Sequence, residues 1–164
     1  MVVYFSRAGG GQHNCSPVLQ VVSAHGTDVE STNSGGDADW KDIATVNVHR
    51  ITNTSKFNIA INCECQATKS GNAYGAPEIR LAIDTGSGDA NNAIGLVGFG
   101  EGLQASDEYD TTSFTYYYSH DFSGVSFARY RLQLKCNRYG TDTSTPVSAT
   151  ASGSLEAIQA EVLS

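Results

Sequence analysis

The chain has 164 residues, a formal net charge of −7 and an isoelectric point of about 4.9. Hydrophobic residues make up 40% of it and charged residues 16%, which suits one globular domain and excludes bulk disorder. It has no block of Lys and Arg to follow a phosphate backbone, and no apolar run near the roughly 20 residues that cross a bilayer. We therefore expect neither nucleic-acid binding nor membrane insertion.

The first 16 residues are expected to form a flexible arm, because "AGGGQHN" is polar and rich in glycine. Pro17 then opens a single domain, 17–164. The start "MVVYFSRAGGG" lacks the basic segment of a secretory signal. We expect synthesis in a reducing cytoplasm, where structural disulfides are rare.

Short segments with alternating apolar and polar residues follow. A strand at 18–25 leads into a polar connection at 26–38, and a second strand is expected at 43–51. A long strand covers 56–67. Further strands are expected at 78–84, 92–100, 113–120 and 126–136, with a turn at 70–77 and a polar loop at 101–112.

Successive side chains of a strand point to opposite faces, so the alternation defines a buried face. Within 56–67 that face comprises Phe57, Ile59, Ile61, Cys63 and Cys65. Within 126–136 it comprises Ala128, Tyr130, Leu132, Leu134 and Cys136. No internal segment has a clear helical period, and the sum predicts an all-β antiparallel sandwich or barrel.

The last segment, "SLEAIQAEVLS", is ambiguous. Leu155, Ile158 and Val162 have helical spacing, whereas the preceding "TSTPVSATASGS" is typical of a strand. The pattern leaves strand and helix equally open.

The spacing Cys63-x-Cys65 is tighter than that of zinc sites, which favour two to four intervening residues. A free cysteine is commonly a small buried hydrophobe. We therefore expect Cys63, Cys65 and Cys136 to be reduced core residues, with no metal and no other cofactor. The acidic "SDEYD" at 106–110 is interpreted as a solvated loop rather than a calcium site.

The stretch "LAIDTGSG" resembles the active-site loop of aspartic proteases, in which two such loops share a proton between carboxylates. This chain has one such loop, so a protease would require a homodimer built around Asp84. The "GLVG" at 95–98 comes too soon to be the second motif of such an enzyme. A glycine-rich turn after a strand is the favoured interpretation, and we expect the protein not to be an enzyme.

Eight tyrosines are unusually many for this length. In "SFTYYYSH", Phe114, Tyr116 and Tyr118 share one face and Tyr117 takes the other. Tyrosine is favoured at subunit interfaces because it combines an apolar ring with a polar tip. We predict that Tyr117, together with Leu96 and Phe99 of "IGLVGFG", lies in an interface between copies.

Four stretches, in this order, resemble small jelly-roll domains of tailed-phage virion proteins of the tail-fibre and head-decoration type. They are "VLQVVSAHGTDVESTNSGG", "SKFNIAINCECQATKSGNAYGAPEIRLAID", "YYYSHDFSGVSFARYRLQLKCNRYGTDT" and "SATASGSLEAIQAEVL". The residues that carry the resemblance are Gln20-Val21-Val22, Ser55-Lys56, Tyr118 with Asp121, Tyr130 with Leu132 and Gln133, and Ser154-Leu155. It spans residues 18–162 and departs from the family in the cysteines and in "EAIQAE".

The resemblance implies a tumour-necrosis-factor-like jelly roll that forms homotrimers, with Tyr117 facing the threefold axis. It also implies that the last segment is a strand.

It further implies a non-enzymatic surface protein of a bacteriophage virion. The absence of a long shaft favours a capsid decoration (cement) or short head-fibre role. Attachment to the major capsid protein or another virion protein is expected through Val2, Val3, Tyr4 and Phe5. The first alternative is a tail-fibre or receptor-binding protein that attaches to host glycan through Tyr74 and Tyr109. The alternative of another class is the dimeric aspartic protease.

Overall fold

A computed structural model describes residues 18–36, 38–51, 55–86, 92–97, 109–121, 126–142 and 144–161. These residues form eight β-strands, and no helix among them is long and apolar enough to cross a membrane. The strands are β1 (Val18–Asn33), β2 (Lys41–His49), β3 (Ser55–Ser70), β4 (Ala73–Asp84), β5 (Asn92–Val97), β6 (Tyr109–Asp121), β7 (Phe127–Gly140) and β8 (Val147–Glu161).

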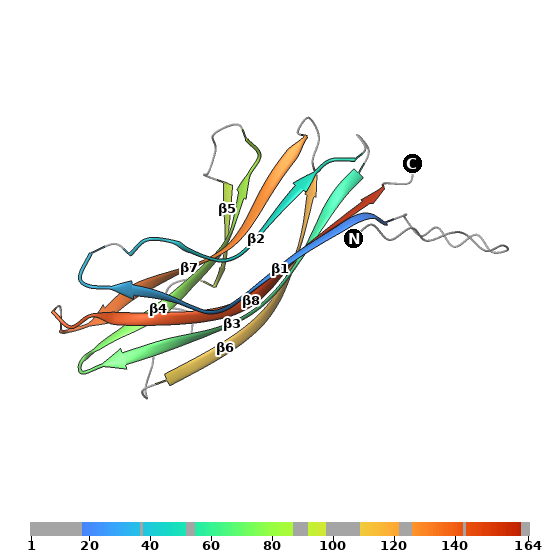
Figure 1. Cartoon of the computed structure of the whole chain (residues 1–164). Coiled ribbons are helices and arrows are strands. Elements are labelled where there is room, and N and C mark those ends of the chain that lie inside the picture. The colour runs from blue at the N-terminus through green and yellow to red at the C-terminus, as the bar shows by residue number, and fades with distance from the viewer. Residues whose placement is uncertain are drawn as a thin grey trace.

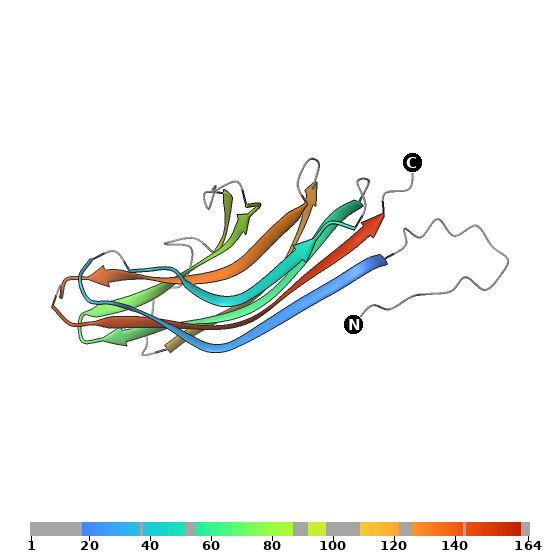
Figure 2. The same ribbon diagram turned by 45° about the horizontal axis from the view of Figure 1, so that its top comes forward.

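The strands form two four-stranded antiparallel sheets that lie as stacked layers (Figures 1 and 2). Sheet I has the order β1-β8-β3-β6 and sheet II the order β2-β7-β4-β5. Among the described residues, the sheets are continuous only at the β3–β4 hairpin, where residues 68–70 pair with 73–75. Eight strands divided in this order between two packed sheets form a jelly roll, so the predicted fold is confirmed.

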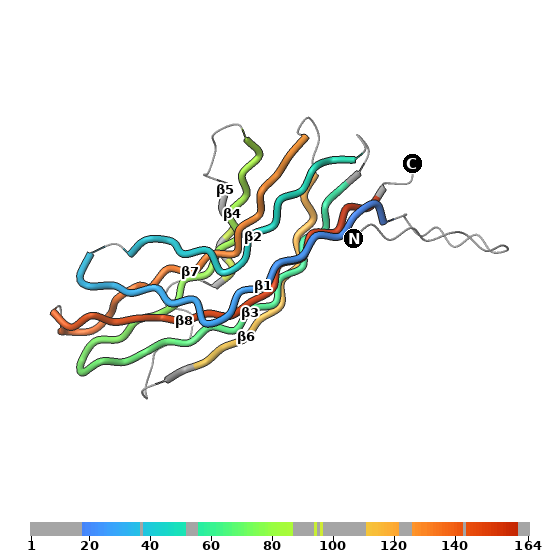
Figure 3. The backbone as a smooth tube through the Cα atoms, in the orientation of Figure 1, coloured from blue at the N-terminus to red at the C-terminus, as the bar shows by residue number. Residues whose placement is uncertain are grey.

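The molecule is elongated, and its two ends differ. The β1–β2, β3–β4 and β7–β8 connections gather at one end, whereas β1 begins and β8 ends at the other (Figure 1). The tube in Figure 3 follows β1 along β8 and β2 along β7, in agreement with their pairing. Each outward residue can therefore be placed by its strand and by the residues that it pairs with on neighbouring strands.

The core lies between the sheets and consists of the apolar faces predicted from alternation. Sheet I contributes Phe57, Ile59, Ile61, Cys63, Cys65, Leu155 and Ala157, and sheet II contributes Val46, Val48, Ile79, Leu81, Ile83, Tyr130, Leu132, Leu134 and Cys136. All of them are at most 4% exposed. Full burial of one such large side chain contributes about 1.5–3 kcal/mol, so the two facing layers supply most of the driving force for folding.

One of the polar contacts that cross this core joins β6 to β7. His120 on β6 and the Tyr130 hydroxyl on β7 lie 2.7 Å apart, with the ring nitrogen Nδ1 as the histidine atom. Burial lowers the pKa of His120, and burial together with Tyr118 raises the pKa of Tyr130. Both groups are therefore neutral near pH 7, and their hydrogen bond joins the two sheets without a buried charge.

The prediction of a polar connection at 26–38 is wrong, because β1 continues to Asn33. Two polar side chains point inward there: Ser31 Oγ accepts a hydrogen bond from Cys136 N at 3.0 Å, and Asn33 Nδ2 donates to Cys136 O at 3.2 Å. The register also shifts between Gly26 and Val29, and Asp28 adopts a φ of 51°. Because Ser31 and Asn33 are polar and the bulge shifts the register, hydrophobic alternation does not reveal this part of β1.

The last segment is strand β8, as the resemblance implies. It lies between β1 and β3 and pairs with both along its length. Leu155 is buried whereas Ile158 points outward, so their three-residue spacing does not mark a helical face. Gln159 points inward and is fully buried, and its Oε1 accepts hydrogen bonds from Gln20 Nε2 (2.6 Å) and Ile51 N (3.3 Å). Pairing on both sides overrides the helix propensity of "EAIQAE".

Other predicted boundaries also differ. The turn expected at 70–77 is confined to residues 71 and 72, and β4 begins directly after it. The loop expected at 101–112 ends where β6 begins at Tyr109. Of the strand expected at 92–100, residues 92–97 form β5, and 98–100 lie outside the described residues.

We expect Gly26→Ala to destabilise the protein by about 1–3 kcal/mol, because its Cβ would lie 1.8 Å from Ile43 O, where β1 crosses β2. The matched control is Gly36→Ala, where a Cβ would meet nothing within 4 Å and should change stability by less than about 0.5 kcal/mol. Urea denaturation of both variants measures the difference. Equal midpoints would show that the strands do not cross as closely as described.

Candidate interaction surfaces

The outer face of sheet I is formed by every second residue of its four strands. Its rows run across β1, β8, β3 and β6, as in His25–Ser154–Asn62–Thr115. Most of these side chains are polar and exposed or half-buried. Two regions stand out from this background: an apolar strip near the end where β1 begins, and a groove in the middle of the sheet.

The apolar strip crosses the sheet diagonally and comprises Val18, Val21, Ala60, Tyr117, Ile158 and Ala160. Tyr117 is 75% exposed, and Val18 and Val21 are 44% and 45% exposed. These are three of the four large hydrophobic residues that are most exposed in the described part of the chain; the fourth is Ile51. Exposed apolar side chains gathered on one face are typical of a protein contact site.

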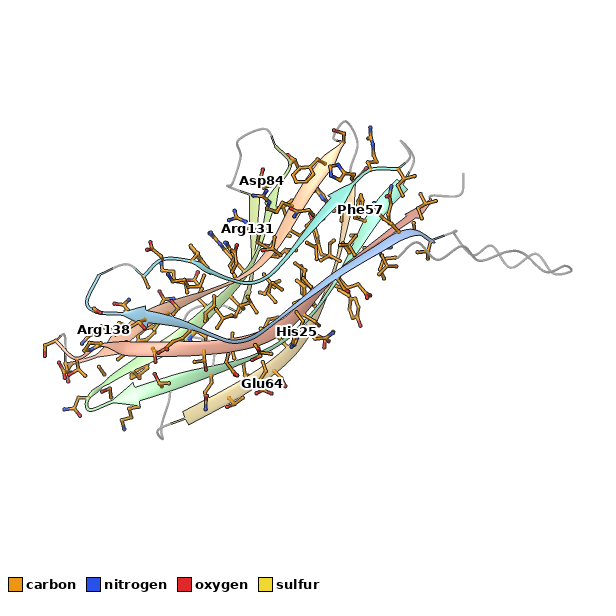
Figure 4. All side chains as sticks on the ribbon, viewed as in Figure 1. His25, Phe57, Glu64, Asp84, Arg131 and Arg138 are labelled. Atoms are coloured by element: carbon orange, nitrogen blue, oxygen red, sulfur yellow. The ribbon has the colours of Figure 1, made fainter. Side chains whose placement is uncertain are left out.

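The groove lies beside the apolar strip and has a volume of about 550 Å³. Its side-chain lining is mostly hydroxyl and amide groups: His25, Asn62, Glu64, Ser113, Thr115, Ser152 and Ser154. Figure 4 shows His25 and Glu64 on the same side of the molecule. Thr115 Oγ1 donates to Asn62 Oδ1 at 2.8 Å, and Asp28 N donates to Ser152 Oγ at 2.9 Å, which fixes the bulge of β1.

The groove is suited to hydrogen bonding. Glu64 is the carboxylate among its lining residues, so it lacks the pair of carboxylates that acid–base hydrolysis uses. The described residues also include no group of three His, Cys, Asp or Glu side chains that could hold a metal ion.

The predicted interface residues lie on different surfaces. Tyr117 projects from β6 into solvent on the outer face of sheet I. Leu96 lies on β5 in sheet II and packs against the core. Phe99 lies outside the described residues. Their role in an interface between copies remains a prediction, with Tyr117 as its exposed member.

The predicted glycan contacts lie near the β3–β4 hairpin. Tyr74 stacks on Tyr139 with ring centroids 5.2 Å apart and an interplanar angle of 14°. Tyr109 begins β6 opposite Thr68, and its side chain is outside the described set. The attachment residues Val2, Val3, Tyr4 and Phe5 also lie outside the described residues.

The three cysteines are buried free thiols, as predicted, and Cys15 lies outside the described residues. Burial raises the pKa of Cys63 to about 12 and the pKa values of Cys65 and Cys136 to about 11 each. The charges of Cys65 and Glu64 add to the shift at Cys63. A thiol needs its thiolate form to react or to bind metal, so these groups are inert at neutral pH.

Asp84 ends β4, and its Oδ1 accepts a hydrogen bond from Gly86 N at 2.9 Å. Gly86 has a φ of 82°, which a glycine adopts without strain. This contact is the turn geometry that the favoured interpretation of "DTGSG" requires. Of the acidic cluster 106–110, only Tyr109 and Asp110 fall within the described backbone.

Sequence reasoning missed a group of side chains on the outer face of sheet II. Trp40 lies over Arg80, with the guanidinium carbon 3.8 Å from the ring centroid. The alternation had placed Arg129 and Arg131 on one face of β7. Their proximity to Arg80 depends on the pairing of β7 with β4, which the sequence does not specify.

No known protein family and no curated protein matches this sequence. Two solved structures share its fold. A chain from the structure of infectious bursal disease virus, Gx strain, aligns with 93% of this chain at 16% identity and a TM-score of 0.60. A chain from the crystal structure of the infectious bursal disease virus VP2 subviral particle aligns with 94% at 15% identity and a TM-score of 0.53. The present chain spans 36% and 37% of their lengths.

We expect the three core thiols to be unreactive toward a thiol reagent in the native protein at pH 7.5, because their raised pKa values leave almost no thiolate. A Cys15→Ser variant leaves these three as its only cysteines. Absorbance after addition of the reagent should show about three thiols only once denaturant is added. Fast labelling of the native variant, or zinc bound at one per chain, would contradict this prediction.

Proposed function

We propose that this protein is a structural component of a virus particle, and that its jelly roll contacts neighbouring subunits through the outer face of sheet I. The observation that carries the proposal is a likeness over 93% of the chain to a chain from a virus structure. The second neighbour, from a subviral particle, has the same fold. The exposed apolar strip gives this chain a surface suited to assembly.

Within particle proteins, we propose the surface of a tailed phage, and capsid decoration rather than a fibre. The ordered resemblance of residues 18–162 to tailed-phage virion domains supports this choice. In this role the N-terminal segment, with Val2, Val3, Tyr4 and Phe5, binds the major capsid protein or another virion protein. The domain then contacts its own copies.

The contact between copies is proposed to be a homotrimer centred on Tyr117. A threefold association buries one surface of each subunit against a different surface of the next. Tyr117 and Val21 supply apolar area, and the hydroxyl and amide groups of the adjacent groove supply a polar rim. A stable contact of this kind buries at least about 1,000 Å² in total, which requires the neighbours of the strip as well as the strip itself.

Two alternatives remain to be tested. A tail-fibre or receptor-binding protein would use the same fold to attach to host glycan. A dimeric aspartic protease would need the carboxylate of Asp84 free to share a proton, whereas here it accepts the Gly86 amide. The protease predicts peptide hydrolysis that Asp84→Asn abolishes, and a particle protein predicts unchanged assembly in that variant.

The functional test is immunogold labelling of intact particles from the virus that encodes this chain. We expect gold over the capsid surface, because a decoration protein covers the shell. Gold confined to the tail would contradict the decoration role and support the tail-fibre role. Particles without label, whose purified proteins also lack this chain, would refute a particle role altogether.

We expect Tyr117→Asp to convert a trimer into monomers, because a carboxylate in the centre of an apolar contact is desolvated without a partner. The matched control is Thr111→Asp, which places the same charge on the same face of β6, six residues away. Sedimentation analysis of the two variants and the parent gives their masses. A trimer that survives Tyr117→Asp, or a parent that is monomeric, would defeat the proposed contact.

A further inference from the structure

The outer face of sheet II carries aromatic and basic side chains along β4 and β7, on the opposite side of the molecule from the apolar strip. These are the outward residues of the two strands, with Trp40 beside them. We define the cationic strip as Trp40, Tyr74, Arg80, Arg129, Arg131, Lys135 and Tyr139. In Figure 4, Arg131 points away from the sandwich on one side, and His25 and Glu64 lie on the other.

Hydrogen bonds and ring contacts fix the middle of the strip. Arg80 stacks on Trp40, and its Nε donates to Gln133 Oε1 at 2.9 Å. Gln133 is 3% exposed, and its Nε2 donates to Asp42 Oδ1 at 2.6 Å. Lys135 Nζ lies 5.9 Å from the same Trp40 ring. Arg80 is therefore held in place before any ligand arrives, which reduces the entropy lost on binding.

The positive charge at the centre is partly offset, because the nearby charges of Glu78 and Asp42 both act to raise the pKa of Arg80. Arg131 is flanked across the sheet by Thr45 and Ala82, and its Nε is buried without a hydrogen-bond partner among the described residues. The ion pair found in the described part of the chain is elsewhere, between Arg138 and Asp142.

The nearest carboxylates are already engaged by neutral donors. Asp42 accepts from Gln133, and Glu78 accepts from Asn137 Nδ2 at 2.8 Å. The pKa of Arg80 is lowered by burial and then by the charge of Arg131, so the two guanidinium groups repel one another. An anionic group placed over the two guanidinium groups would relieve this repulsion.

We propose that the cationic strip binds an acidic polysaccharide, with carboxylate or sulfate groups held by Arg131, Arg80 and Lys135. From Tyr74 to Asp84, β4 advances by ten residue steps, or about 34 Å at roughly 3.4 Å per step, which accommodates several sugar units. Stacked Tyr74 and Tyr139 at one end supply apolar ring surface, and Asn137 and Asn47 add amide groups along the path.

A sugar fits better than a nucleic acid. Asp42, Glu78 and Asp84 alternate with the cations along this face, and closely spaced phosphates would be repelled by them. A polysaccharide also carries neutral hydroxyl groups that can donate hydrogen bonds to these carboxylates, whereas a DNA backbone has no such donor. The site is distinct from the proposed assembly surface on sheet I, so a subunit in a particle could still present it.

The test uses the full chain and two immobilised probes: heparin, which carries sulfate and carboxylate, and polygalacturonate, which carries carboxylate alone. Biolayer interferometry at low salt should show saturable binding to at least one probe, and the probe that binds identifies the group. We expect Arg131→Gln and Lys135→Gln each to weaken binding on the order of tenfold, because each removes a charge-assisted hydrogen bond.

The matched control is Lys56→Gln, which removes the same charge from the outer face of sheet I and should change affinity by less than about twofold. Circular dichroism confirms that each variant is folded. The proposal is overturned if neither polysaccharide binds, if neutral dextran binds as well, or if Arg131→Gln matches Lys56→Gln. Equal affinity for a single-stranded 20-nucleotide DNA would also overturn it, in favour of a general polyanion surface. Its failure would leave the particle role untouched, since immunogold labelling tests that separately.

Discussion

Packing of the inward rows of sheet I against those of sheet II is the contact on which the other features of this structure depend. Phe57, Ile59 and Ile61 of β3 share one core with Tyr130, Leu132 and Leu134 of β7, and none of the six is more than 1% exposed. The rings of Phe57 and Tyr130 lie 6.3 Å apart between centroids. Every second residue of each strand is committed to this contact. The remaining residues form two outer faces that are free to take on other chemistry, and the two faces differ accordingly.

Sheet I presents mostly neutral polar groups and an apolar strip, whereas sheet II presents Arg80, held by Trp40 and Gln133, beside Arg129 and Arg131. An apolar, largely uncharged face suits contact between protein subunits, and a preorganised cationic face suits an anionic ligand. In the functions proposed above, assembly and recognition use opposite sides of one domain. The same two-sheet fold in chains from a virus structure and a subviral particle is consistent with a domain whose loops and outer faces determine its role.

The sequence predicts the core of this fold well, because the alternation in β3, β4 and β7 follows directly from strand geometry. It fails where polar residues point inward. Ser31 and Asn33 are buried and hydrogen-bond to the backbone of Cys136, so the sequence of their segment resembles a loop. Gln159 is buried and accepts hydrogen bonds from Gln20 and from the Ile51 amide, so the sequence of its segment resembles a helix. The apolar strip and the cationic strip are also beyond sequence reasoning, because each joins residues from strands far apart in the chain. Tyr117 is the exception, since its neighbours Tyr116 and Tyr118 already assign it to the outer face.

The position of β8 tests the two-sheet structure most directly, because β8 pairs with both β1 and β3 and so joins β1 to the rest of sheet I. Hydrogen–deuterium exchange followed by mass spectrometry measures the protection of the amides at 149–157. The account predicts exchange as slow as that of the core strands β3 and β7, at the rate of global unfolding. Rapid exchange in this segment, with protection elsewhere, would contradict the two-sheet structure and with it both proposed surfaces.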